Sequence, residues 1–146
     1  MMKDWEDCKE KKKVKEIQEN PEQARSLLIL AKRRMKSIEK RKEDEYPQLL
    51  LESYYEAIKE LLTALLALDG YKSYSHECLI SYINDIEPDL IEYQYTHLID
   101  DLRLLRSDII YRGRDIAQDY LFRNLDDIER IIEILIDALE KRLDDK

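Results

Sequence analysis

The residues best suited to chemistry lie in the segment "LRLLRSDIIYRGR", residues 102–114, which holds four arginines in a chain of net charge −8. Arg112 and Arg114 flank a glycine at the predicted end of a helix, where the helix dipole favours cations. Arg106 lies instead at the edge of an apolar stripe, where a long cationic side chain either snorkels to solvent or is held for a partner. A planar guanidinium is suited to binding phosphate through two parallel hydrogen bonds.

Tyr111 follows Arg106 five residues later, just before the glycine. A phenol with a reference pKa of about 10 is a poor base at neutral pH, but it can donate a hydrogen bond to phosphate or stack on a base. Positions five apart on a straight helix differ by about 140°, so these two side chains converge only if the helix loosens or a second chain completes the site. We predict ligand binding by Arg103, Arg106, Ser107 and Tyr111.

His76 is the third candidate for a catalytic role, beside Arg106 and Tyr111. It lies in the first turn of a predicted short helix, where the helix dipole disfavours a positive charge. We therefore expect a neutral imidazole, available as a base or held in a structural hydrogen bond.

Other site classes find little support in the sequence. Two glycines cannot build a phosphate-binding loop. The residues three before His76 and His97 are Ser73 and Gln94, so the usual Glu-x-x-His pairs of di-iron bundles are missing. Neither histidine has the spacing from a cysteine that zinc sites show. We expect no metal and no cofactor.

The elements that must position these residues are helices. The chain has 146 residues with only two glycines and three prolines, which leaves little turn chemistry for hairpins. Capping residues and apolar stripes with steps of three and four predict each helix. The predicted helices run from Pro21, after the N-cap Asn20, to about Arg41; from Pro47 to Gly70; from Ser73 or Ser75 to Pro88; from about Asp89 to Gly113; and through the stripe Leu121–Leu139.

The predicted fold is therefore an all-α, up-and-down four-helix bundle with an extra short helix and an N-terminal helical extension. We place the extension at residues 1–19 and the bundle at 20–146. The stretch Lys3–Glu19 has few apolar residues, so we expect a helix that docks late or frays. The broad apolar arc of residues 47–70 indicates a helix central in the bundle or one that also faces a partner chain.

Charge and cysteine content suggest where the protein works. Two cysteines are too few for a disulfide framework, so we expect a reduced, cytoplasmic setting with Cys78 as a buried, inert thiol. We also expect no signal peptide and no membrane span. Residues 1–42 carry 14 Lys and Arg against 8 Asp and Glu, whereas residues 43–146 carry 11 against 25. We interpret the basic first third mainly as solvated helix faces.

The segment "LRLLRSDIIYRG" resembles the signature helix of HEPN domains (higher eukaryotes and prokaryotes nucleotide-binding). In that family an arginine, often followed by a polar residue, precedes a histidine by four to six positions. The resemblance places the arginine at Arg106, the polar residue at Ser107 and the histidine position at Tyr111. The segments "SYYEAIKELLTALLALDGY" and "SHECLISYI" are also similar, and the pattern covers about residues 22 to 143.

The resemblance implies a homodimer formed around this helix, a nucleotide or RNA ligand, and a nucleotidyltransferase-type partner protein. Active family members cleave RNA without a metal ion, and Tyr111 replaces their histidine. Three interpretations stay open: a binding or adaptor module without efficient cleavage; a metal-independent RNase toxin of a toxin–antitoxin pair, with His76 as the proton carrier; or a structural dimerisation domain in which Arg106 pairs with a carboxylate such as Asp100, Asp101 or Asp108.

Overall fold

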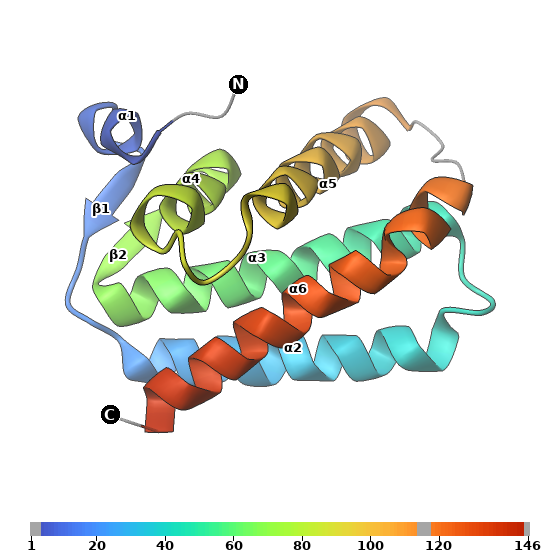
Figure 1. Cartoon of the computed structure of the whole chain (residues 1–146), viewed down its shortest axis with the longest axis horizontal. Coiled ribbons are helices and arrows are strands. Elements are labelled where there is room, and N and C mark those ends of the chain that lie inside the picture. The colour runs from blue at the N-terminus through green and yellow to red at the C-terminus, as the bar shows by residue number, and fades with distance from the viewer. Residues whose placement is uncertain (1–3, 114–117, 145–146) are drawn as a thin grey trace.

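The computed structural model describes residues 4–113 and 118–144 and confirms the predicted all-α bundle. The four long helices alternate in direction along the chain, and the short helix α4 lies between the second and third of them (Figure 1). In chain order the elements are α1 (Trp5–Glu10), β1 (Val14–Glu16), α2 (Pro21–Arg41), α3 (Pro47–Asp69), β2 (Tyr71–Ser73), α4 (His76–Ile86), α5 (Tyr93–Arg112) and α6 (Gln118–Asp144).

The helix ends follow the capping residues of the sequence. The Asn20 side chain accepts a hydrogen bond from the Gln23 amide at 3.0 Å, and Pro21 occupies the first turn of α2. Ser75, rather than Ser73, caps α4. Gly70 and Gly113 end α3 and α5 with φ of +84° and +61°, the left-handed conformation that glycine adopts without steric cost. The predicted bounds of α2 and α3 and the predicted C-terminal end of α5 are therefore confirmed, whereas α5 begins at Tyr93 and not at about Asp89.

Helix α3 is the centre of the bundle, as its broad apolar arc predicted. It contacts α2, α4, α5, α6 and β2, and it is buried on nearly all sides between Leu50 and Leu68. In Figure 1, α4 and α5 lie on one side of α3, while α2 lies on the other and α6 crosses both α2 and α3. Residues on different sides of α3 can therefore contribute to different surfaces of the protein.

The prediction of one continuous helix over Lys3–Glu19 is wrong. Helix α1 ends at Glu10, Lys12 adopts a left-handed φ of +57°, and β1 pairs antiparallel with β2 in the register Val14↔Ser73. After the Lys11–Lys13 run the apolar residues are too sparse to cover a helix face, and backbone pairing with β2 prevails over local helix propensity. This N-terminal arm, residues 4–16, does not fray, because Trp5, Cys8 and Val14 belong to the continuous core.

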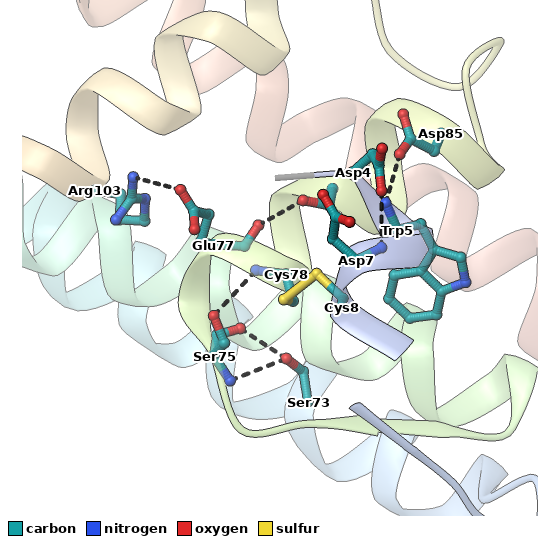
Figure 2. Close-up of a disulfide and its surroundings, with 11 residues drawn as sticks. Asp4, Trp5, Asp7, Cys8, Ser73, Ser75, Glu77, Cys78, Asp85 and Arg103 are labelled. Atoms are coloured by element: carbon teal, nitrogen blue, oxygen red, sulfur yellow. Dashed lines mark hydrogen bonds and ion pairs between the residues drawn. A yellow bond between two sulfur atoms is a disulfide. The ribbon is translucent and has the colours of Figure 1, made fainter. Parts of the chain in front are cut away.

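The prediction of a free thiol at Cys78 is also wrong. Cys78 is fully buried, as expected, but it forms a disulfide with Cys8, which joins α1 to α4 (Figure 2). The same contact is supported by the amide of Trp5, which donates to the Asp85 carboxylate at 2.8 Å. The cysteines therefore give no indication of a reducing compartment. In the part of the chain that the structure describes, no helix has the length and apolarity needed to cross a bilayer.

Candidate functional site

Helix α5 carries the predicted arginines and lies against α3 and α4 (Figure 1). The Arg106 Nη2 donates to Glu56 Oε1 on α3 at 3.2 Å, and both side chains are only 19% exposed. The Arg106 Nε is buried and has no hydrogen-bond partner in the described structure. On the edge of the guanidinium that faces α3, Arg106 therefore binds the carboxylate through Nη2 alone, and its Nε makes no hydrogen bond to a described residue.

Glu56 is shared between two cations. Its second oxygen, Oε2, lies 2.8 Å from Lys59 Nζ. Burial on its own raises the pKa of the Glu56 carboxyl, but the hydrogen bond from Lys59 and the charges of Lys59, Arg106 and Arg34 outweigh it and lower that pKa below its usual value. Glu56 is therefore ionised at neutral pH and neutralises the cations around it.

Arg103 lies one helical turn before Arg106 and is also paired. Its Nε donates to Asp100 on the same helix at 2.8 Å, and its Nη2 lies 3.5 Å from Glu77 on α4. Figure 2 shows the Arg103–Glu77 contact beside the disulfide, since Glu77 directly precedes Cys78. The position of the arginine cluster is thus linked to the segment that the disulfide anchors.

His76 lies at the start of α4 and within electrostatic range of the same cluster. Its half-buried ring packs near Tyr55, with ring centroids 6.0 Å apart. Burial lowers the pKa of His76, and the nearby charges of Lys59, Arg106 and Arg103 lower it further, although Glu56 opposes them. The expected neutral imidazole is therefore supported, but its main cause is burial rather than the helix dipole.

The predicted ligand residue Tyr111 lies apart from this cluster. It occupies the last turn of α5, is 78% exposed, and makes no hydrogen bond or ring contact with described residues. Arg106, by contrast, is directed to α3. Helix α5 stays regular through its last turn, so the side chains of Arg106 and Tyr111 do not meet within one chain. Ser107 is half-buried on α5. Arg112 is an exposed C-terminal residue 3.9 Å from Asp108, and Arg114 lies outside the described residues.

The carboxylate opposite Arg106 was not among the aspartates suggested by the sequence. Glu56 comes from α3, fifty residues earlier, and Asp100 pairs with Arg103 instead. A signal for Glu56 exists in the sequence: Glu52, Glu56, Lys59 and Glu60 place charges at spacings of three and four in the middle of a largely apolar helix. Such a polar stripe on a central helix marks the direction from which charged neighbours approach.

The candidate site is therefore a half-buried charge cluster formed by α3, α4 and α5: Tyr55, Glu56, Lys59, His76, Glu77, Asp100, Arg103 and Arg106. The arginines and Lys59 supply cationic hydrogen-bond donors, and the neutral imidazole could exchange a proton. No group of three or more His, Cys, Asp or Glu suited to a metal ion occurs among the described residues. The described arrangement is suited to binding an anion, provided that the anion displaces a carboxylate.

Comparison of the chain with protein-family models, with curated proteins and with solved structures gave no match.

Proposed function

We propose that this chain is a HEPN-like module that binds the phosphate of a nucleotide or RNA at Arg103 and Arg106, without efficient cleavage. The observation that carries the proposal is the unused Nε of Arg106. Another arginine of the chain forms both hydrogen bonds: Arg34 donates to Glu60 through Nε, at 3.0 Å, and through Nη2, at 2.8 Å. A phosphate that replaced Glu56 would give Arg106 the same two-pronged geometry.

We propose further that a second copy of the chain covers α5. Leu104, Ile110 and Tyr111 expose 50%, 41% and 78% of their surface on this helix, and Leu104 and Tyr111, seven residues apart, share one face of it. Large apolar side chains exposed on one face are typical of interaction surfaces. This face lies nearly opposite Arg106 on the helix, so the dimer is proposed independently of the phosphate site. A nucleotidyltransferase-type partner stays a prediction from the resemblance.

Nucleotide titration of matched variants tests the phosphate site. Arg106→Gln should weaken binding at least tenfold, since hydrogen bonds to charged groups contribute about 1.5–3 kcal/mol. Glu56→Gln removes the competing negative charge and should strengthen binding. The control is Arg130→Gln, which removes an equal charge from an exposed pair on α6. If Arg106→Gln lowers stability but leaves affinity unchanged, Arg106 has only a structural role and the proposal fails.

Sedimentation of the wild type and Leu104→Glu tests the dimer. The wild type should sediment as a dimer and the variant as a monomer, because the substitution places a charge on the proposed interface. A wild type that stays monomeric at high protein concentration would exclude the second-copy arrangement.

A second candidate is a metal-independent RNase in which His76 handles the proton. It is favoured by one observation: the fold brings a neutral, half-buried imidazole within electrostatic range of Arg106 and Arg103. If this candidate is right, the protein should cleave RNA in the presence of a metal chelator, and the His76→Ala variant should not cleave it. Absence of cleavage by the wild type would exclude this candidate, and cleavage that survives in His76→Ala would exclude its mechanism.

A further inference from the structure

Helix α2 carries a basic groove on the outside of the bundle. The groove has a volume of about 400 Å³ and is lined entirely by cationic and hydroxyl residues, with no carboxylate among them. We call it the α2 groove, and its lining residues are Arg33, Lys36, Ser37, Lys40 and Arg41. A surface of this composition is unexpected in a protein whose net charge is −8.

Three cations of the α2 groove are unneutralised. Arg33, Lys36 and Lys40 are exposed and make no hydrogen bond or ion pair with any described residue. The nearest acid along the helix, Glu39, is held by Lys42 at 3.0 Å. Lys32, Arg34 and Arg41 of the same helix are paired, for example Lys32 with Glu140 at 3.1 Å.

The spacing of these three cations aligns them in a row. Positions 33, 36 and 40 are separated by three and four residues, so they share one face of α2. With a rise of about 1.5 Å per residue, the row is about 10 Å long. A row of positive charges matches a linear polyanion better than it matches a single small anion.

The α2 groove shares one lining residue with a second groove that reaches the candidate site. Arg41 also lines a second groove, together with Arg34, Glu45, Leu49, Glu52, Ser53 and Glu56. Glu56 is the carboxylate that holds Arg106. The second groove contains three carboxylates, and its two arginines are paired, Arg34 with Glu60 and Arg41 with Glu45. The unpaired cations therefore lie in the α2 groove rather than in the second groove.

We propose that the α2 groove binds backbone phosphates of single-stranded RNA, which makes the ligand of this protein a strand rather than a free mononucleotide. This inference rests on the proposed function, because it extends the phosphate site at Arg106. The lining side chains end in cationic and hydroxyl groups, and no aromatic or aliphatic residue is among them. Contacts of this kind read the backbone and not the sequence.

The test compares two triple variants of equal charge. Arg33→Gln/Lys36→Gln/Lys40→Gln removes the groove cations, and Lys32→Gln/Arg130→Gln/Lys141→Gln removes three cations from exposed ion pairs elsewhere. The measurements are the affinity for a fluorescent oligouridylate at several salt concentrations and, separately, the affinity for a mononucleotide. Melting curves should show both variants folded, since all six side chains are at the surface.

The salt dependence gives the expected magnitude. Each phosphate contact on a single strand contributes about 0.7 to the slope of log affinity against log salt, so three contacts contribute about 2. Between 50 and 200 mM salt, the wild type should therefore lose about 16-fold more RNA affinity than the groove variant. The control variant should keep the wild-type slope, and both should bind the mononucleotide like the wild type.

The outcomes separate this inference from the function on which it rests. An RNA slope that is equal in the groove variant and the wild type overturns the inference, even if the mononucleotide binds. A groove-dependent RNA slope without mononucleotide binding overturns the site at Arg106 but supports the groove. Equal loss of slope in both triple variants assigns the effect to net charge and overturns the inference. Displacement of RNA by polyglutamate at equal charge concentration overturns the assignment to a nucleic acid.

Discussion

The disulfide between Cys8 and Cys78 provides the sharpest test of the fold. The perturbation is the double variant Cys8→Ala/Cys78→Ala, compared with the oxidised wild type. Both cysteines are 0% exposed, and 70 residues separate them along the chain. Because the sulfurs are buried, a reductant added to the folded protein should act slowly, so the reduced wild type is best prepared in denaturant and refolded.

The magnitude follows from the length of the closed loop. Cross-linking residues that far apart removes loop-closure entropy from the unfolded chain equivalent to about 4 kcal/mol at 25 °C. Against a typical total stability of about 5–15 kcal/mol, this is a large fraction. The bond also holds the N-terminal arm, which closes over the core through Trp5; its ring packs edge-on against Tyr71 and Tyr82 at 5.2 and 5.4 Å.

Two measurements follow the change. Urea unfolding should give the oxidised wild type about 4 kcal/mol more stability than the reduced wild type or the double variant. Hydrogen exchange should report the arm itself, because the amides of Ile17 and Tyr74 donate to Gly70 and Lys13 across the β1–β2 pair, each at 2.8 Å. These amides should exchange faster once the bond is absent, while those of α3 keep most of their protection.

Thiol titration tests most directly whether the Cys8–Cys78 bond forms. Two reactive thiols in the unfolded, unreduced protein would show that the bond does not form. Equal stability of oxidised wild type and double variant, with the bond verified by mass spectrometry, would show that loop closure in the unfolded chain does not govern stability here.

Three further predictions concern other parts of the structure. Burial lowers the pKa of His76 in the folded protein, so as pH decreases the unfolded chain is protonated at His76 before the folded protein is. Stability should therefore fall as pH decreases below about 6.5 and level off below the folded pKa. The decrease in melting temperature between pH 7 and pH 5 should be smaller in His76→Gln than in the wild type. Glu60→Gln removes the charge of a 7%-exposed carboxylate that Arg34 binds through two hydrogen bonds and should cost about 1–3 kcal/mol in urea unfolding, whereas no loss would show that the pair is dispensable. Gly70→Ala should destabilise the protein more than Gly113→Ala, since both have left-handed φ but only at Gly70 would the new Cβ meet a backbone oxygen, that of Ile17, at 3.0 Å; equal thermal shifts would contradict this reading.

Local sequence patterns predict only part of the candidate site. Arg106 could be selected from the sequence because it lies at the edge of an apolar stripe, and Arg103 belongs to the same arginine-rich segment. Their partners Glu56 and Glu77 belong to other helices, and no pattern along α5 specifies which helix packs against it. Tyr111 lies on the same helix as Arg106 but apart from it, because positions five apart differ by about 140° around the helix axis.

The sequence by itself determined the helices from α2 to α6 and most of their ends. Asn20, Pro47, Gly70 and Gly113 act on backbone groups within a few residues, and the apolar stripes act through a period that repeats along one segment. Tertiary structure alone decided the β1–β2 pair, the Cys8–Cys78 bond and the carboxylate opposite Arg106. Each of these joins residues about 50 to 70 positions apart, and only the packing of α1, α4 and α5 around the bundle brings such residues within bonding distance.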